Sequence, residues 1–345
     1  MDNSVVISTP PHVKSRRTTK NIMLDVIIAL LPAAIMGIVY FRLNAFILEI
    51  TCVLAAVATE FVYYFIANKG FSDKCKHAGE VCKKWLHQFD FTSIVTGLIL
   101  ALILPSTAKW YEGLIGAIFA IAIVKMVFGG TGKNLVNPAA SGRVFMFLSF
   151  SITTYVACAV GPVASEGFLF TGATHLSGFI LKSGEGVKLS WLDLLLGTGV
   201  AGCIGETCKL ALIAGYIYLC VRDVIKWWQP LLYIVLSAFL SVCFAAMGSK
   251  TFEIGLFLDY MLSGGLMFGA IFMATDYVTS PKGVYGQLVY YIALAVLTAA
   301  LRYLTKIEVV SFVIMFMNLL VPLIDTYVVR KPFGYKKVKK QKEGK

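Results

Sequence analysis

The chain has 345 residues, of which 58% are hydrophobic and only 14% are charged. Soluble domains carry about 25% charged residues, so this composition predicts an integral membrane protein and excludes an ordinary soluble enzyme. The net charge of +12 would suit nucleic acid, but its distribution along the chain favours a membrane surface, and we expect no nucleic-acid partner.

The chain begins with a polar, basic segment, residues 1–20. This segment lacks an apolar core that ends in a small-residue cleavage site, so we do not expect a secretory signal peptide. We interpret it as an N-terminal tail. Residues 327–345 are rich in Lys and Arg and form a second, basic tail.

Between the tails, residues 21–326 predict a transmembrane domain. An apolar run of about 20 residues can cross a bilayer as a helix, and somewhat shorter runs also qualify. Such runs lie near 21–40, 44–66, 91–105, 110–128, 143–160, 206–221, 228–247, 259–275, 285–303 and 308–326. The fold class expected is therefore an all-α polytopic membrane protein of about ten transmembrane helices.

The positive charges distinguish the two sides of this domain. Most of the 31 Lys and Arg residues fall in segments on the same side as the N-terminus. Cytoplasmic loops carry such an excess, so both tails are predicted to be cytoplasmic. The polar segment 161–190 then lies on the outer face.

Two stretches, 91–150 and 260–328, follow the same plan. Each has a short span with Ser and Gly, a break, a second span, and an Asn followed by a Pro. An odd number of spans separates them, which gives them opposite orientations. We therefore predict two inverted five-helix repeats with short, broken helices, an arrangement that builds sites near the bilayer midplane.

Several ionisable residues lie in or at the ends of the predicted spans. A charge at the centre of a membrane helix costs about 2.5–3.5 kcal/mol on insertion scales, so such residues line a pathway or find partners. Glu206 and Lys209 are three residues apart and could pair with each other. Glu60 has no nearby local partner in the sequence, and Asp325 lies at the end of the last span. For Glu60, Asp276 and Asp325, ion-pathway and structural roles both stay open. The other such residues are Asp25 and Glu49.

The outer segment 161–190 carries the sequence Thr171-Gly172-Ala173-Thr174. A Thr beside Gly and Ala has an uncrowded hydroxyl, which suits covalent attachment of a large group. The alternative is a helix N-cap or a turn, which Ser and Thr beside Gly commonly form.

The eight Cys residues contain no Cys-x-x-Cys pair and lie mostly in apolar runs, so no metal site is expected.

Four motifs together resemble one family. They are the Gly-Gly-x-Gly-x-Asn-x-x-Asn-Pro-Ala run at 129–139, the Thr-Gly-Ala-Thr at 171–174, the segment 274–279 (Ala-Thr-Asp-Tyr-Val-Thr), and the segment 318–325 before the basic tail. Over nearly its whole length the chain resembles the D subunit of the Rnf electron-transport complex, a relative of the B subunit of the sodium-pumping NADH:quinone oxidoreductase.

The resemblance implies two flavins. FMN is expected on the hydroxyl of Thr174 as a phosphoester installed by a flavin transferase, with Thr171, Gly172 and Ala173 completing the motif. Riboflavin is expected in the helical core, and we assign Asn137 to cofactor binding. The flavins would carry the redox chemistry, while the protein supplies position and electrostatics.

The resemblance also implies an assembly. The complex would pass electrons from reduced ferredoxin to NAD⁺ and export Na⁺ or H⁺ across a bacterial or archaeal cell (inner) membrane. This chain would be one subunit, inactive alone, among A-, B-, C-, E- and G-type partners, closest to the flavin-bearing G-type and the NAD-binding C-type partners. The family's cation-handling acids match Glu60, Asp276 and Asp325 in local context.

One feature departs from the family pattern. The family usually has an Asp just upstream of the attachment motif and a Pro after it, whereas this chain has Phe168, Leu169 and His175 at these places. A transferase that reads the upstream Asp would modify Thr174 poorly.

Two other interpretations of the whole chain are a cofactor-free solute channel or transporter with an inverted-repeat fold, and a passive membrane scaffold.

Overall fold

The computed structural model describes residues 17–67, 75–150, 159–160, 171–172, 190–197, 200, 202–247, 254–305 and 307–328. Within these ranges the chain is helical except for loops and two short antiparallel strands, β1 (Ala159–Val160) and β2 (Thr171–Gly172). An all-α fold is thus confirmed. Most of each tail and most of 161–190 lie outside the described residues.

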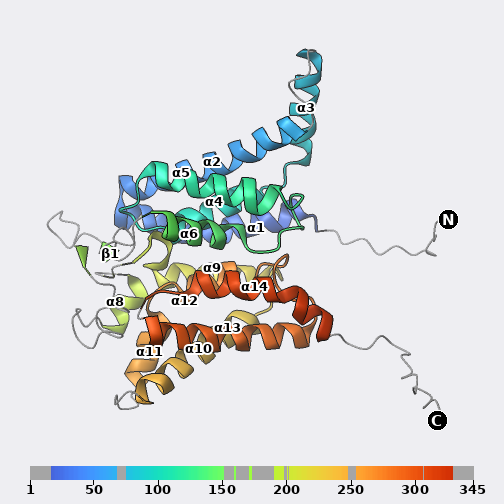
Figure 1. Cartoon of the computed structure of the whole chain (residues 1–345). Coiled ribbons are helices and arrows are strands. Elements are labelled where there is room, and N and C mark those ends of the chain that lie inside the picture. The colour runs from blue at the N-terminus through green and yellow to red at the C-terminus, as the bar shows by residue number, and fades with distance from the viewer. Residues whose placement is uncertain are drawn as a thin grey trace, which may run out of the picture.

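The described residues of the first half of the chain form six helical segments (Figure 1). They are α1 (Thr19–Phe41), α2 (Leu43–Ala67), α3 (Cys75–Gln88), α4 (Thr92–Ile103), α5 (Trp110–Ile118), which continues as the π-helix η1 (Phe119–Met126), and α6 (Pro138–Ser149). Pro138 stands at the start of α6, where its missing N–H costs nothing and its fixed φ suits a helix.

The second half follows a similar sequence of segments. After α8 (Trp191–Leu196) and the short 3₁₀-helix η3 (Ile204–Glu206) come α9 (Lys209–Val221), α10 (Trp228–Met247), α11 (Ile254–Leu262), α12 (Leu266–Phe268), the π-helix η4 (Gly269–Met273), α13 (Val284–Thr305) and α14 (Val310–Tyr327).

The helices are those of a polytopic membrane protein. Among the described residues, five helices are long and apolar enough to cross a membrane, namely α1, α2, α10, α13 and α14, and up to seven spans result if each of two bent helix pairs counts as one. Each predicted apolar run overlaps a helical segment, but several segments, such as α4 and α9, are shorter than a full span. Large apolar side chains such as Ile35, Val39 and Leu54 are exposed on the long helices, as lipid-facing residues must be.

The two halves are built alike and point in opposite directions. In the first, α2 packs against α4 and α5; in the second, α10 packs against the corresponding α12, η4 and α13. Each half has a sharply bent pair in the corresponding place, α3 with α4 (69°) and α11 with α12 and η4 (61°). The outer arms of these pairs, α3 and α11, lie at opposite ends of the molecule (Figure 1). This arrangement agrees with the inverted repeats that the sequence predicts.

The halves meet along two helix pairs, and the molecule has two distinct ends. α1 packs along α9, and α6 packs along α14. The start of α1 and the end of α14 lie at one end, which we call the tail face; β1, β2 and α8 lie at the other, which we call the loop face (Figure 1).

A short connection enters the protein from the loop face. The backbone N–H of Ile204 donates to the carbonyl of Leu104 at the end of α4, over 3.1 Å. Gly205 lies so close to Leu102 and Phe268 that a Cβ there would come within 2.6 Å of the Leu102 Cβ. η3 therefore ties together the inner ends of α4 and α12, and its backbone is covered by protein rather than by lipid, as a non-helical segment at membrane depth requires.

Candidate functional site

A central cleft opens between the two halves near the tail face. Its walls are formed by α1, α4, η1, the segment 131–139, the end of α9, η4 and the segment 275–278. The corresponding α4 and α12–η4 segments of the two repeats thus face the same space. Ligand sites in transporters with inverted repeats lie at such an interface.

Asn137 organises the floor of the cleft. Its side-chain oxygen accepts hydrogen bonds from the N–H groups of Ala139 and Ala140, and so caps α6. Its side-chain N–H donates to the carbonyl of Met273 in η4, over 3.3 Å. Asn137 therefore joins the two repeats and lines the cleft, while its polar atoms are largely engaged by protein. Its assignment to cofactor binding stays a prediction.

Asn134 presents an unsatisfied group at the same site. It lines the cleft, and its buried side-chain oxygen has no hydrogen-bond partner among the described residues. A buried acceptor without a partner is costly, because it has lost its water without replacement. A ligand that donates an N–H or O–H would remove this cost. Thr96 and Thr131 add hydroxyls to the walls, and Phe272 and Tyr277 add aromatic surface.

Asp276 stands at the wall of the cleft. Its carboxylate accepts a hydrogen bond from the N–H of Val278 (3.2 Å) and one from the hydroxyl of Thr279 (3.1 Å). These contacts turn the chain after η4 and hold the carboxylate in place by neutral donors rather than by a cation. Asp276 is therefore available to a ligand or a cation in the cleft.

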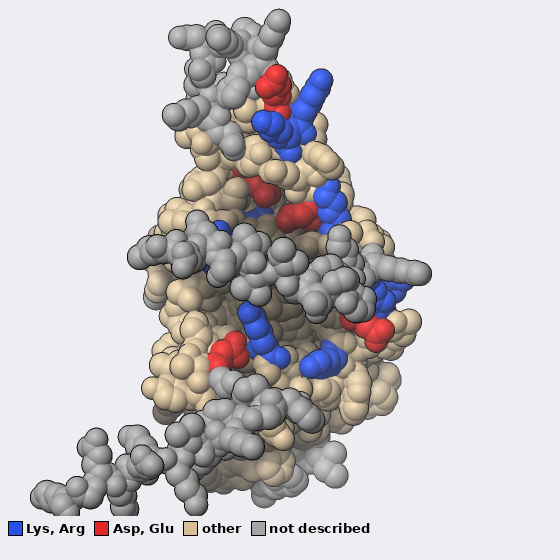
Figure 2. Space-filling model, turned by 90° about the vertical axis from the view of Figure 1, so that its right-hand side faces the viewer, with Lys and Arg blue, Asp and Glu red and all other residues tan. Residues whose placement is uncertain are grey.

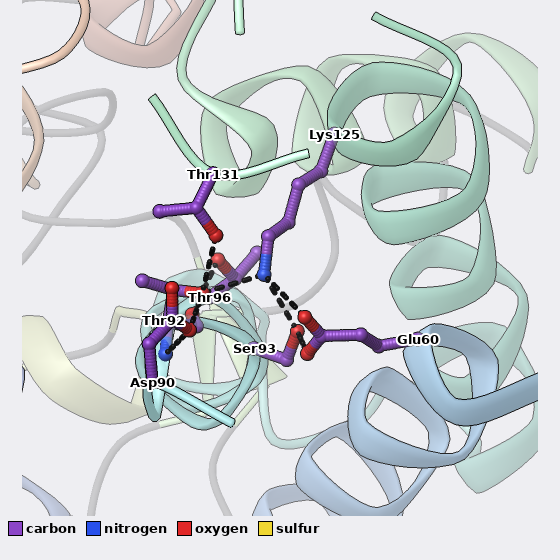
Figure 3. A network of polar contacts seen from close by, with 7 residues as sticks. All are labelled: Glu60, Asp90, Thr92, Ser93, Thr96, Lys125 and Thr131. Atoms are coloured by element: carbon purple, nitrogen blue, oxygen red, sulfur yellow. Dashed lines mark hydrogen bonds and ion pairs between the residues drawn. The ribbon is translucent and has the colours of Figure 1, made fainter. Parts of the chain in front are cut away.

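Glu60 is the centre of a buried polar network (Figure 3). One carboxylate oxygen accepts from the ammonium of Lys125 over 3.2 Å, and the other accepts from the hydroxyl of Ser93. The ammonium also donates to the hydroxyls of Thr92 (2.5 Å) and Ser93 (3.0 Å). The Lys125 side chain is 2% exposed and the Glu60 side chain 12%.

The elements explain why these groups meet. Glu60 comes from α2, Ser93 and Thr92 from the first turn of α4, and Lys125 from η1, and all three elements pack together. A π-helix has a wider turn than an α-helix and is often found at functional sites. η1 places Lys125 inward, facing Glu60, although the surrounding sequence is apolar.

A side pocket adjoins this network at the tail face. It is lined by residues of α2, α3, the loop before α4 and the loop after η1, among them Glu60, Asp90 and Thr131. Acidic side chains lie in a recess on this face, beneath the projecting α3 (Figure 2). Lys125 lines the central cleft and Glu60 lines the side pocket, so their ion pair forms a partition between the two spaces.

Asp325 has a different hydrogen-bond partner from Glu60 and Asp276. It sits near the end of α14, where its carboxylate accepts a hydrogen bond from the backbone N–H of Lys282 over 3.2 Å. The three predicted ion-pathway acids thus share the tail face without forming one cluster: Glu60 at the side pocket, Asp276 at the cleft and Asp325 at the loop before α13. Their role in ion movement stays a prediction.

The first two residues of the predicted FMN attachment motif lie at the loop face. The backbones of Thr171 and Gly172 form β2, which pairs with β1 in the register Ala159 with Gly172. Ala173 and Thr174 lie outside the described residues.

Sequence reasoning missed Lys125, which it counted with the charges of a cytoplasmic segment. A lone Lys within the apolar run 119–128 was the available signal. Glu206 and Lys209, which the sequence left as a possible pair, do contact each other, but through the backbone carbonyl of Glu206 rather than its carboxylate. The Lys209 ammonium donates to the backbone carbonyls of Glu206 and Gly264, and the Glu206 carboxylate accepts from the N–H of Cys203. Both groups are used to hold η3 against α12.

A family model described as "NQR2, RnfD, RnfE family" matches residues 6–334. The chain belongs to this family. The resemblance that the four sequence motifs indicate is confirmed.

Individual relatives in this family are similar over most or all of the chain. The chain is 37% identical to the D subunit of the Na(+)-translocating ferredoxin:NAD(+) oxidoreductase complex of Acetobacterium woodii, over 98% of each chain. It is 33% identical to the D subunit of the proton-translocating ferredoxin:NAD(+) oxidoreductase complex of Clostridium ljungdahlii, over 96% of this chain and 97% of the relative. It is also 33% identical to the B subunit of the Na(+)-translocating NADH-quinone reductase of Chromohalobacter salexigens, over 71% of this chain and 60% of the relative.

Proposed function

We propose that this family member is the membrane subunit of an ion-translocating ferredoxin:NAD⁺ oxidoreductase complex, and that it carries electrons on bound flavin. The observation that carries the proposal is the end-to-end similarity to two relatives named as the D subunits of such complexes. The relatives differ in the ion named, so the similarity supports the reaction class and leaves the coupling ion to experiment.

FMN joined to Thr174 would be the flavin of the loop face. The motif Thr171-Gly172-Ala173-Thr174 supports this assignment through its uncrowded hydroxyl and its resemblance to the family motif. With the chain orientation that the positive charges predict, the attachment site faces outward and both tails face the cytoplasm. The membrane would be that of a bacterial or archaeal cell, and the G-type and C-type subunits would be the nearest partners.

Riboflavin would occupy the central cleft. The fit rests on the side-chain oxygen of Asn134, which has no partner among the described residues and can accept a hydrogen bond from an N–H of the isoalloxazine ring. It rests also on the aromatic surface of Phe272 and Tyr277. Thr96 and Thr131 can bind polar atoms of the ring or the ribityl chain. When bound, a flavin supplies one- and two-electron transfer, and the protein fixes its position and excludes water. Asn137 would position the cleft by joining α6 to η4.

The riboflavin site can be tested on the purified full chain. Acid precipitation releases non-covalent flavin, which chromatography then identifies and quantifies. We expect Asn134→Ala to retain less than half of the riboflavin that the native chain retains, because the variant lacks the free acceptor. Asn44→Ala, at the loop face, is the matched control and should retain the native amount. If both variants retain the native amount of riboflavin, the assignment of riboflavin to the cleft is wrong.

The ion pathway can be tested in the assembled complex. Membranes that contain Glu60→Gln or Asp325→Asn should show a weaker cation dependence of ferredoxin-driven NAD⁺ reduction than native membranes. If both variants respond to Na⁺ and to pH as the native complex does, these acids lie outside the pathway. A colourless chain that conducts a solute when reconstituted alone would support a channel instead.

A further inference from the structure

The Lys125 ammonium occupies a cage of oxygen atoms. Its three hydrogen-bond acceptors are the Glu60 carboxylate and the hydroxyls of Thr92 and Ser93, at 3.2, 2.5 and 3.0 Å. Figure 3 shows the ammonium pointing into this group, with the Ser93 hydroxyl bridging to the second Glu60 oxygen. Carboxylate and hydroxyl oxygens are also the ligands that a hard, dehydrated cation such as Na⁺ takes in proteins.

The network holds more negative than positive charge. Glu60 and Asp90 are both linked to Thr92 or Ser93, and the Thr92 hydroxyl donates to Asp90 over 2.6 Å. The network thus contains two carboxylates and one ammonium, and of the two carboxylates the ammonium contacts Glu60. A buried carboxylate needs a cation nearby, because removing it from water is costly. The cage can therefore exchange its ammonium for another cation, but it cannot remain empty.

Lys125 lies between two spaces that could supply the exchange. The side pocket, with Glu60 and Asp90 in its wall, opens at the tail face and offers a cation an entry. The central cleft lies on the other side, and Lys125 is part of its wall together with Asp276. A lysine has a long flexible stem and a compact charge, so its ammonium can leave the cage for the cleft without a backbone change.

We propose that the oxygens of Glu60, Thr92 and Ser93 form an exchangeable site for a monovalent cation, at which the Lys125 ammonium is the resident competitor. A cation that enters from the side pocket takes the place of the ammonium, which moves into the central cleft. Negative charge in the cleft favours this exchange, since it attracts the ammonium. This negative charge would come from the flavin of the proposed function, and only this part of the proposal rests on that function.

The competition predicts a gain of cation affinity when the ammonium is removed. Lys125→Met keeps the length of the side chain and vacates the cage. We expect this variant of the full chain, in detergent and with choline as the balancing ion, to bind ²²Na⁺ tighter than the native chain by about tenfold or more. Lys125→Met/Glu60→Gln should lose this gain, because the cage then lacks its carboxylate.

The matched control is Lys226→Met. Lys226 also lies at the tail face, but its ammonium donates to the side-chain oxygen of Gln287 rather than to a carboxylate. Its removal should leave ²²Na⁺ affinity unchanged. Native affinity in Lys125→Met, or equal gains in Lys125→Met and in the double variant, would overturn the proposal and leave a structural ion pair.

A second measurement uses the native chain and so does not depend on the folding of a variant. A small amine-reactive reagent should label Lys125 more strongly as Na⁺ replaces choline, because the displaced ammonium enters the cleft. Labelling of Lys226, read in the same mass spectrum, should stay constant. If labelling of Lys125 does not rise with Na⁺, the ammonium does not leave the cage and the proposal fails.

Both experiments work in a Thr174→Ala chain prepared without riboflavin. If Na⁺ does not displace the ammonium in that chain, the exchange proposal fails and the flavin assignments are unaffected. If instead the flavin assignments prove wrong, the measured Na⁺ site still stands.

Discussion

Glu60 and Lys125 are 65 positions apart in the chain and form an ion pair that is almost entirely buried. The cost of burying a charge identified Glu60 in the sequence, because no local partner followed it. The same cost applies to Lys125, but it was not read as buried, because a basic residue near the end of an apolar run usually extends to the membrane surface. Only the packing of η1 against α2 and α4 brings the two charges together.

Removing one partner of this pair should destabilise the protein more than removing both. Glu60→Gln leaves the Lys125 ammonium without its carboxylate, at a cost of about 3–5 kcal/mol. Lys125→Met in addition removes the stranded charge and should restore much of the stability. Thermal unfolding of the three proteins in detergent measures this. A double variant less stable than Glu60→Gln would mean that the pair contributes chiefly through packing.

A second buried pair lies in the other repeat, near the loop face. The Arg302 guanidinium donates from one nitrogen to both carboxylate oxygens of Glu308, at 2.9 and 3.0 Å, and the Arg302 side chain is 1% exposed. Its Nε and Nη1 have no hydrogen-bond partner among the described residues. Glu308 is therefore the group that balances the buried positive charge of Arg302.

Glu308→Gln should for this reason destabilise the chain more than Arg302→Met. The first change strands a buried cation, whereas the second removes it and leaves a Glu308 that is partly exposed to solvent. Unfolding midpoints of the two variants, measured in the same detergent, show which variant is less stable. The reverse order would show that Glu308, not Arg302, is the costly group.

At the scale of elements, the apolar runs predicted helices well because length and hydropathy are read directly from sequence. The π-helices η1 and η4 could not be predicted, since the choice between an α-turn and a π-turn depends on packing rather than on a hydrophobic period. α3 was also missed as a helix, because its polar, basic sequence is typical of a loop. Both omissions affect the site: η1 carries Lys125 and α3 covers the side pocket.

α1 and α9, which belong to different repeats, approach each other closely at a glycine. A Cβ at Gly215 would clash with the backbone carbonyl of Ala29. Gly215→Ala should therefore force α1 and α9 apart and cost about 1–3 kcal/mol. Gly255 in α11 faces open space, so Gly255→Ala should be neutral or stabilise by up to about 1 kcal/mol. Unfolding of both variants in detergent tests this, and equal midpoints would contradict the close approach of these helices.

At the scale of the whole molecule, two halves of opposite direction enclose one cleft. The sequence predicted this plan from two similar stretches separated by an odd number of spans, and the bent pairs α3–α4 and α11–α12 occupy corresponding places. The sequence could not predict the cleft itself. Its walls come from separate segments of both halves, and no local pattern indicates which of them meet.

The orientation in the membrane is a further prediction at this scale. A short epitope at the C-terminus and another inserted within 176–189 should be accessible from opposite sides of the membrane, with the C-terminal one inside. Antibody binding to intact and permeabilised cells, or to spheroplasts where an outer membrane is present, distinguishes them. Accessibility of both epitopes from the same side would contradict the assignment of the attachment motif to the outer face.

The central claim is that this chain carries flavin, and in-gel fluorescence of the denatured chain tests it most directly. A flavin joined through a phosphoester survives denaturation, whereas a flavin held by non-covalent contacts is lost. The native chain, produced with its flavin transferase, should give a fluorescent band at its own mass, and Thr174→Ala should give none while Thr171→Ala keeps the band. A dark native band, or a fluorescent Thr174→Ala band, would contradict the assignment.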